Sequence, residues 1–332
     1  MKNTNNHHNL VKHSMKSRSF MGKGTKKYLW IGLVMIGIMA GCSDRSDKKE
    51  ESGYLPVKGR FLGEEKPGNE PQLFGRDIFS TFHHVSDITF QADGRELFFT
   101  ASVNDRRVLM YTGEVKEHWL VPSVFIHSGQ YNDRQPCFVP YRKAFYFVSD
   151  RPREKNSAAA DEDIWYTYET MEGWDTPHHL EASINTAMDE FSPSVTREGT
   201  LYFIRGDDYA GGNVYRAKIK EGAFEIPEKL SGMINETGDI TGVSVTPDES
   251  VMVLSRASLN GEEMNEYLIS FRDDEDVWST PAAMGNRFGF RGQEGSARFT
   301  SGGQYCFFIA AAQDTTGSAV YWVTSAALNR IK

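Results

Sequence analysis

The chain has few cysteines, no cluster of basic residues and no long apolar run, and each shortage argues against one class of protein. Its 332 residues include 3 cysteines, with no Cys-x-x-Cys pair and no group of cysteines and histidines, so structural zinc is not expected. The net charge is −8, and the repeats contain no large cluster of lysine and arginine, so no nucleic-acid partner is expected. The apolar run from Leu29 to Ala40 holds about 12 residues, whereas a membrane-spanning helix needs about 20.

Signatures of catalysis are missing as well. No Gly-x-Ser-x-Gly motif is present; the nearest segment, Gly242 to Thr246, falls in a predicted strand without the following helix that would expose a serine. Sialidase-type Asp boxes (Ser-x-Asp-x-Gly-x-x-Trp) are absent. The pairs His83-His84 and His178-His179 occupy adjacent positions, which face opposite ways on a strand, and we expect them in solvent or loops. We therefore predict no catalytic residue, metal ligand or cofactor.

What the sequence does contain is a repeat of strand, tight polar turn and strand. The copies are Ile88 to Phe99, Pro136 to Phe147, Ser192 to Ile204, Val243 to Val253 and Ala297 to Phe308. They recur about every fifty residues, a period typical of β-propellers. One such unit cannot bury both faces of its small sheet, and a ring of units can.

Each copy continues into a third strand, and all but the last into a fourth, outer strand. The third strands are expected at Val108–Tyr111, Asp163–Tyr166, Asn213–Arg216, Glu266–Ile269 and Ala319–Trp322. The fourth strands, marked by Trp or Phe and by Pro, are expected at Trp119–Pro122, Trp174–Pro177, Phe224–Pro227 and Trp278–Pro281. We expect Glu70–Phe74 to supply the missing outer strand of the last copy and so to close the ring without a free edge.

The predicted fold is thus an all-β propeller of five four-stranded blades, closed by an N-terminal strand. The alternative is six blades, if the N-terminal segment forms a blade of its own. The propeller is expected over residues 54–332. Cys137 and Cys306 lie on copies that are not neighbours in a ring of five, so we predict two buried free thiols.

The N-terminal region indicates where in the cell the protein is located and carries no information about the fold. Three lysines between residues 23 and 27 precede the apolar run, which ends at Met39-Ala40-Gly41-Cys42, a sequence similar to a bacterial lipobox. We predict a signal peptide over residues 1–41, with a lipidated (palmitate-bearing) Cys42 that anchors the protein to the membrane. An ordinary signal peptide or a short uncleaved anchor is the alternative.

Two further predictions concern this region. Residues 1–20 are polar, and the true start is expected at Met15 or Met21. Residues 42–53 are rich in Asp, Glu and Lys and are expected to form a flexible tether. The expected location is the bacterial cell envelope, as an outer-membrane lipoprotein on the periplasmic or the surface face.

The repeat resembles the TolB-type WD40-like propellers, a family that includes small bacterial envelope lipoproteins. The residues that carry the resemblance are Phe61-Leu62-Gly63, Pro67-Gly68, Pro71, Ile78 to Thr81, Thr89-Phe90, Asp93-Gly94, Leu97 to Phe99, the Ser-Pro-x-Val-x-x-x-Gly-x-Leu-Tyr-Phe copy at Ser192, and Val320 to Trp322. The resemblance covers Tyr54 to Leu328. It implies a propeller that acts as a binding scaffold, and it implies no shared catalytic set.

One set of charged residues recurs at the start of the first strands. Asp133, Glu190 and Glu294 stand five residues before the apolar residue that precedes each turn, and Asp239 stands one residue earlier than that position. Strand starts of this kind converge near a propeller channel, so the four could form a ligand or cation site at its mouth. Alternatively, each caps its own blade or pairs with an arginine such as Arg134 or Arg298. A third alternative is catalysis by two of them, as in glycoside hydrolysis.

The function predicted from these observations is a lipid-anchored envelope propeller that binds a protein, a peptide or a glycan. The alternative is a carbohydrate-active hydrolase or lyase that uses carboxylates on inner strands.

Overall fold

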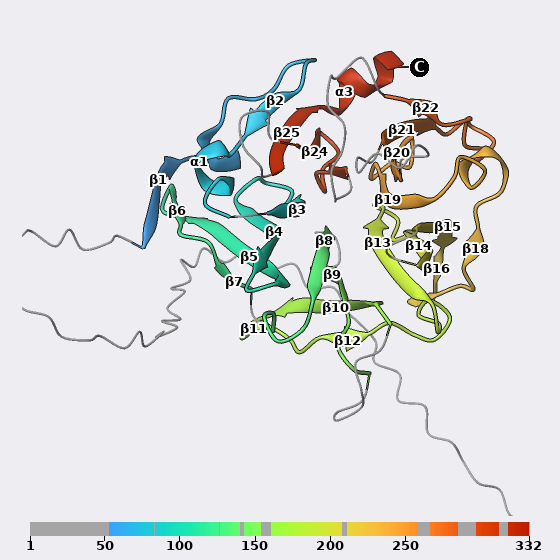
Figure 1. Cartoon of the computed structure of the whole chain (residues 1–332), viewed down its shortest axis with the longest axis horizontal. Coiled ribbons are helices and arrows are strands. Elements are labelled where there is room, and N and C mark those ends of the chain that lie inside the picture. The colour runs from blue at the N-terminus through green and yellow to red at the C-terminus, as the bar shows by residue number, and fades with distance from the viewer. Residues whose placement is uncertain are drawn as a thin grey trace, which may run out of the picture. The chain divides into compact units, whose positions relative to one another are not determined.

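The computed structural model describes residues 53–82, 84–125, 127–139, 143–153, 161–207, 211–257, 266–284, 297–311 and 318–331. In these residues the structure is mostly β-strand (Figure 1). The signal segment, Cys42 and almost all of the predicted tether lie outside them. None of the helices in the described part is long and apolar enough to cross a membrane.

The strands of the first two copies form one sheet each. The first sheet has six strands, in the order β1 (Tyr54–Lys58), β6 (His118–Leu120), β5 (Arg106–Val115), β4 (Glu96–Val103) and β3 (Val85–Phe90), with β7 (Ser123–Val124) also paired to β5. The second has five strands, in the order β11 (Gly173–Trp174), β10 (Asp163–Thr170), β9 (Ala144–Ser149) and β8 (Asp133–Val139), with β12 (His178–His179) also paired to β10.

The other copies form an eight-stranded sheet, a four-stranded sheet and a two-stranded hairpin. An eight-stranded sheet contains β13 (Asp189–Val195), β14 (Leu201–Asp207), β15 (Gly211–Ala217), β19 (Ile240–Val245), β20 (Val251–Arg256), β21 (Glu266–Phe271) and β22 (Ala282–Ala283), with β18 (Glu228–Lys229) on β15. A four-stranded sheet has the order β2 (Gln72–Phe74), β25 (Ser318–Thr324), β24 (Tyr305–Ala311) and β23 (Arg298–Phe299). β16 (Ile219–Lys220) pairs with β17 (Ala223–Phe224).

Short helices complete the described part. They are α1 (Arg76–Phe79), α3 (Ser325–Leu328), η1 (Phe61–Gly63), η3 (Gly232–Ile234) and η4 (Asn329–Ile331). The sequence analysis did not predict them, because a single turn of helix has no apolar period to read.

Copies three and four share one sheet, where separate blades were expected. The link is one bridge, in which Gly212 of β15 pairs with Ile240 of β19. The backbones can approach because Gly211 and Gly212 have no side chains. A Cβ atom added at Gly211, whose φ is +92°, would lie 2.9 Å from Cβ of Asp239.

The third strands of all five copies are confirmed, and four outer strands are each divided in two by the proline. Before the proline, the Trp or Phe pairs with the end of the third strand in the first two copies (Glu114↔Trp119 and Glu169↔Trp174) and with the segment just after it in the next two (Ile219↔Phe224 and Arg272↔Trp278). After the proline, a second piece pairs with the third strand and starts at Ser123, His178, Glu228 and Ala282. Proline has no N–H to donate to a ladder, so it divides the outer strand into two pieces.

The first strands of the copies contain bulges that accommodate proline. In β8, Gln135 and Pro136 lie in a register shift between Arg134 and Cys137, and in β13, Ser192 and Pro193 lie in the equivalent shift. Gln135 and Ser192 adopt φ values of 53° and 55° there. A proline in a strand interior is tolerated at a bulge because the ladder is already interrupted.

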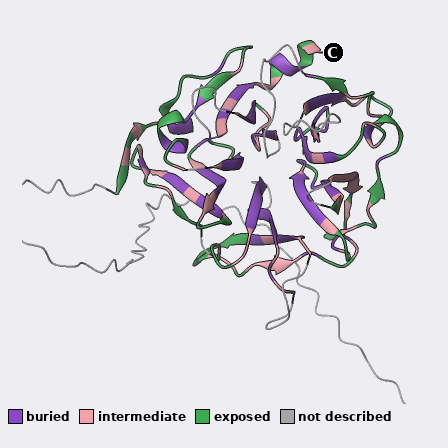
Figure 2. Cartoon of the chain, in the orientation of Figure 1, coloured by how far each residue is buried: buried purple, intermediate pink, exposed green. Residues whose placement is uncertain are grey.

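Hydrogen bonds between side chains and backbone connect each copy to the next. They run from Gln135 N to Thr100 Oγ1 at 3.2 Å, from Ser192 N to Gln135 Oε1 at 2.7 Å, from Val243 N to Ser192 Oγ at 2.9 Å, from Phe299 N to Ser244 Oγ at 3.1 Å and from Ser301 Oγ to Phe90 O at 3.2 Å. The last bond returns to the first copy. In Figure 1 the strands β3, β8, β13 and β19 lie innermost, and Figure 2 shows that they are largely buried.

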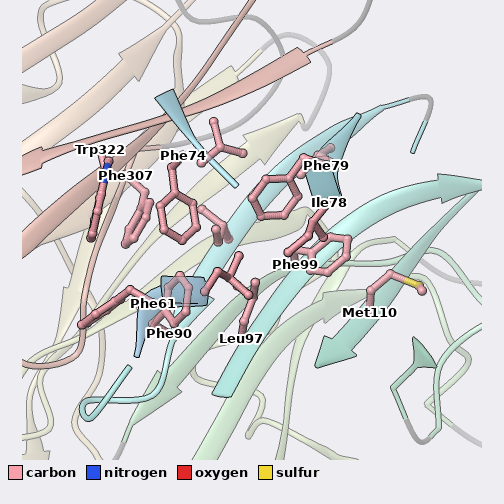
Figure 3. Packing of buried hydrophobic residues seen from close by; sticks show 14 of the residues in the cluster. Phe61, Phe74, Ile78, Phe79, Phe90, Leu97, Phe99, Met110, Phe307 and Trp322 are labelled. Carbon is pink, nitrogen blue, oxygen red and sulfur yellow. The ribbon is translucent and has the colours of Figure 1, made fainter. Parts of the chain in front are cut away.

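The N-terminal segment packs between the first sheet and the last one. β2 pairs with β25 in the register Gln72↔Trp322 and Phe74↔Val320, which confirms the pairing expected for this segment. The ring of Phe74 lies 4.9 Å from that of Trp322 and 5.0 Å from that of Phe307, and the ring of Phe61 lies 5.1 Å from that of Phe90 (Figure 3). Close aromatic pairs add about 0.5–1.5 kcal/mol each to the free energy gained by burial.

Both cysteines in the described part are buried free thiols, as expected. Burial raises the pKa of the Cys137 thiol and, more strongly, that of the Cys306 thiol, while the charge of Arg298 opposes both shifts. These thiols are therefore protonated and unreactive at neutral pH.

Candidate functional site

Asp133 is held at the start of β8 by its own sheet. Its side chain is fully buried, and Arg151, which follows β9, donates from Nη2 to Asp133 Oδ1 at 2.6 Å. Ser128 Oγ donates to Oδ2 at 2.8 Å. The guanidinium of Arg151 also lies over the ring of Phe147, 4.8 Å from its centre. The gap beside Asp133 is too narrow for a water molecule.

Glu190, in the next copy, is likewise held by an arginine and a hydroxyl group. Arg205 of β14 donates from Nε to Glu190 Oε1 at 2.7 Å, and the Thr186 hydroxyl donates to the same oxygen at 2.7 Å. The backbone N–H of Thr186 donates to Oε2 at 2.7 Å. Both carboxylate oxygens thus have strong partners, and the side chain is fully buried.

Burial sets the direction of the pKa of both carboxyls. Removal from water raises the pKa of Asp133, against the charge of Arg151 and the hydrogen bonds from Ser149, Arg151 and Ser128. It likewise raises the pKa of Glu190, against the hydrogen bonds from Thr186 and Arg205. Each carboxylate is thus matched by a guanidinium group at contact distance.

The two remaining acidic candidates are Asp239 and Glu294. Asp239 is exposed directly before β19, and Glu294 lies outside the described residues. Position 240, which corresponds to Asp133 and Glu190, is isoleucine. The shared channel-mouth site stays a prediction.

Arg151 and Arg205, and not the adjacent Arg134, hold Asp133 and Glu190. Arg134 donates from Nε to Glu162 Oε1 at 3.1 Å. Arg298 donates from Nη1 to the carbonyl oxygen of Pro193 at 2.6 Å, and its pairing with Glu294 stays a prediction. Arg205 lies on the second strand of its hairpin, and Arg151 lies just after the second strand of its own. Each arginine comes close to its carboxylate only when the two strands of the hairpin pair.

A polar cluster that the sequence analysis missed lies at the start of β10. The buried Asp163 accepts hydrogen bonds from Arg153 Nε at 2.8 Å and Nη2 at 3.1 Å, and its Oδ2 lies 2.9 Å from His179 Nε2. Asn185 Nδ2 lies 3.0 Å from that same histidine nitrogen. His179 is therefore on a strand beside a carboxylate, where we had expected a solvent-exposed or loop residue. The two aspartates at positions 161 and 163 could have drawn attention to this place in the sequence. Nothing in the sequence indicated that His179, sixteen residues later, would lie beside Asp163.

A pocket lies at the other end of the first strands, among their turns. Its volume is about 240 Å³. It is bounded by the turn after β13 (Arg197), the turn after β19 (Thr246 to Ser250), the turn after β23 (Gly302 and Gly303) and the start of α3 (Ser325). Gly303 lies so close to Pro247 that an added Cβ would stand 3.0 Å from its ring, so two of these turns form one continuous wall.

Within the described part of the chain, no group of three or more His, Cys, Asp or Glu side chains is placed to hold a metal ion. The polar clusters there consist of carboxylates paired with arginine, histidine, hydroxyl and amide groups.

Comparison with known proteins gives structural likenesses only. No protein-family model and no curated protein sequence matches the chain. Among solved structures it is similar to TolB from Acinetobacter baumannii, with 13% identity and a TM-score of 0.46 over 73% of this chain and 52% of that one. It thus spans about half the length of that TolB chain.

Two enzymes give likenesses of the same order. One is the α-L-arabinofuranosidase PaAbf62A from Podospora anserina, with 12% identity and a TM-score of 0.45 over 78% of this chain and 94% of that one. The other is a gluconolactonase from Xanthomonas campestris, with 10% identity and a TM-score of 0.40 over 82% of this chain and 99% of that one.

Proposed function

We propose that residues 54–332 form a β-propeller of five blades, closed by β2. Support comes from the hydrogen bonds that link each copy to the next and return from Ser301 to Phe90, and from the pairing of β2 with β25. Five blades are favoured over six because the N-terminal segment is divided between two existing sheets. β1 extends the first sheet and β2 completes the last, so none of it is left for a further blade.

We propose that this propeller is a binding module for a protein, a peptide or a glycan, and not an enzyme. The observation that carries the proposal is the occupation of Asp133 by Arg151 and Ser128 in a gap too narrow for water. Glycoside hydrolysis needs two carboxylates that flank a sugar with room for the bond to be cleaved. Glu190, with partners on both oxygens, offers no better candidate.

The test is to incubate the mature lipoprotein in detergent with a panel of polysaccharides and aryl glycosides, beside the Glu190→Gln variant and the exposed control Asp274→Asn. We expect no product from any of the three. Product release that Glu190→Gln abolishes without lowering the melting temperature would contradict the proposal and establish the alternative, a carbohydrate-active hydrolase or lyase.

We propose that Cys42 carries the lipid that anchors the module to the outer membrane, with residues 42–53 as its tether. The support is the lipobox-like Met39 to Cys42 after a basic and apolar segment. Labelled palmitate should be incorporated into the wild-type protein and not into Cys42→Ser. Cys137→Ser, which alters a buried thiol, is the control and should keep the label. Equal labelling of the wild-type protein and Cys42→Ser would exclude this anchor.

A further inference from the structure

The outer edge of the first copy carries a row of exposed apolar side chains. Val115 ends β5 and is 37% exposed, Val121 stands between β6 and β7 and is 50% exposed, and Val124 ends β7 and is 48% exposed. Val115 pairs with His118 of β6. The three valines therefore recur at intervals of three residues along the divided outer strand, in a row of at most about 20 Å at 3.3 Å per residue.

The same three positions in copies two, three and four hold mostly polar or small residues. The strand registers and the prolines align these positions with Thr170, Thr176 and His179 in copy two, with Lys220, Ile226 and Lys229 in copy three, and with Asp273, Thr280 and Ala283 in copy four. Exposed outer strands usually carry polar or charged residues, because a bare apolar edge promotes aggregation. Three valines on one outer edge are therefore a liability unless something covers them.

The predicted tether enters the fold beside this row. The backbone N–H of Val121 donates to the carbonyl oxygen of Gly53, the last residue of that tether, at 3.1 Å. β1 follows directly and pairs with β6 at Tyr54↔Leu120 (Figure 1). Val121 thus lies at the point where the chain from Cys42 reaches the first sheet.

With the proposed lipid on Cys42, the tether keeps this edge near the membrane. Gly53 is eleven residues after Cys42, so the connection spans at most about 40 Å, and about 20 Å on average for a flexible chain. A folded body of about 280 residues has a radius of gyration of roughly 19 Å and a diameter of about 50 Å. The tether is therefore shorter than the body that it holds, so the edge at Gly53 meets the membrane more often than the opposite edge does. Because the anchor already holds the protein at the surface, a small apolar row can bind there although it could not bind a membrane alone.

The charges around the row indicate which part of a membrane it fits. Lys58, Lys116 and Glu117 are exposed beside it, and the backbone N–H of Gly59 connects β1 to this turn by donating to the Glu117 carbonyl oxygen at 3.3 Å. Charges of both signs around an apolar row suit the boundary between headgroups and acyl chains, where apolar side chains are buried by about 5–10 Å. They do not form the basic cluster that attraction to anionic headgroups would need.

We propose that Val115, Val121 and Val124 form a membrane-contact surface, which rests on the headgroup–acyl boundary of the bilayer that holds the lipid of Cys42. The inference rests on the proposed anchor and adds an orientation to it. The outer edge of the first copy faces the membrane, and the copies on the far side stay open to a binding partner.

The test places a fluorescent probe in the row and measures whether lipid quenches it. Val121→Cys is labelled with a thiol-reactive nitrobenzoxadiazole, since Cys137 and Cys306 are buried, and the mature lipoprotein is reconstituted into phosphatidylcholine vesicles with or without brominated acyl chains. Ile226→Cys, at the same outer-edge position of copy three and 87% exposed, is the matched control. We expect brominated lipid to lower the emission at position 121 about twofold or more and to leave the emission at position 226 unchanged.

Two further measurements test the apolar character of the contact. Val115→Ser and Val124→Ser, added to the labelled Val121→Cys protein, should lower the quenching about twofold because they remove apolar contact area. They should not lower the melting temperature, because both side chains are exposed. An increase in salt to about 0.5 M, which screens charges, should leave the quenching unchanged.

The outcomes separate the surface from the anchor. Equal quenching at positions 121 and 226, or none at position 121 in protein that floats with the vesicles, would overturn the surface and leave the anchor in place. Loss of quenching at high salt would assign the contact to charged groups. A probe at position 121 that is shielded only at a high protein-to-lipid ratio would assign the edge to a second copy, and either result would also overturn the surface. Protein that does not float with the vesicles would overturn the anchor and, with it, this orientation.

Discussion

At the scale of single residues, the buried Asp133–Arg151 ion pair allows a test of whether the carboxylate at the start of β8 stabilises the fold. Asp133→Asn removes one charge of a buried pair and leaves Arg151 without its counter-charge. We expect a loss of about 3–5 kcal/mol in the free energy of unfolding. Urea denaturation measures it, and the exposed Asp239→Asn should change the value by less than about 0.5 kcal/mol.

The double variant Asp133→Asn with Arg151→Met separates the two contributions to that loss. Because it removes both charges, it should recover part of the stability lost in the single variant. If Asp133→Asn alone unfolded at the wild-type urea concentration, the pair would not be a structural element.

A second residue-scale prediction concerns pH. Hydrogen bonds from Tyr168 and then His178 lower the pKa of Asp175 to about 2. A carboxyl whose pKa is depressed by folding contributes stability above its unfolded value, near 3.8, and loses it as the pH falls toward about 2. Asp133 and Glu190, whose pKa values are raised, act in the opposite direction.

The comparison of wild-type protein with Asp175→Asn isolates this group from the other carboxyls. The wild-type protein should lose more stability than the variant between pH 4 and about 2, measured by urea denaturation at each pH. Parallel stability curves for the two proteins would show that Asp175 titrates normally.

At the scale of secondary-structure elements, the stability contributed by β2 resides in Phe74. Its ring is fully buried and packs against the rings of Trp322 and Phe307 (Figure 3), and truncation of such a residue typically costs about 3–5 kcal/mol. We therefore expect Phe74→Ala to lower the free energy of unfolding by about that amount, as measured in urea.

The adjacent residue provides the matched control. Leu73 lies on the same strand and is 38% exposed, so Leu73→Ala should cost less than about 1 kcal/mol. Similar losses in both variants would mean that the strand pairing, and not the aromatic cluster, holds this segment.

The elements also show what sequence could and could not predict. The hairpins and third strands follow from a local pattern, in which alternating apolar residues flank turns such as Asp93-Gly94. The positions predicted for them were therefore correct. The Trp and Pro markers located the outer strands but not their division at each proline. The partner of Asp133 was missed because sequence places Arg134 beside it, whereas the hairpin brings Arg151 to it. The joining of copies three and four depends on one close approach at Gly211 and Gly212.

At the scale of the whole molecule, the two strands of the N-terminal segment should differ in local stability. Among the described strands, β1 pairs only with β6, at the edge of the first sheet, and its residues alternate between exposed and half-buried. β2 lies beside β25 and buries Phe74 in the aromatic cluster. Strands with few buried contacts open at lower free energy than core strands do.

Hydrogen exchange followed by mass spectrometry tests this difference. Peptides that cover Tyr54–Lys58 should exchange well before those that cover Gln72–Phe74 and Ser318–Thr324, which we expect to exchange together. Simultaneous exchange of all three would show that the segment opens as one cooperative unit.

The position of β1 has a mechanical consequence. If the tether holds the protein to a membrane, a pull on the tether reaches β1 before any other described strand. The register of β1 on β6 contains only the pairs Tyr54↔Leu120 and Lys58↔His118. Under such tension these few bonds yield first, and the freed length of chain then absorbs the extension before force reaches Phe74. In a protein tethered in this way, β1 would therefore detach first and spare the rest of the fold.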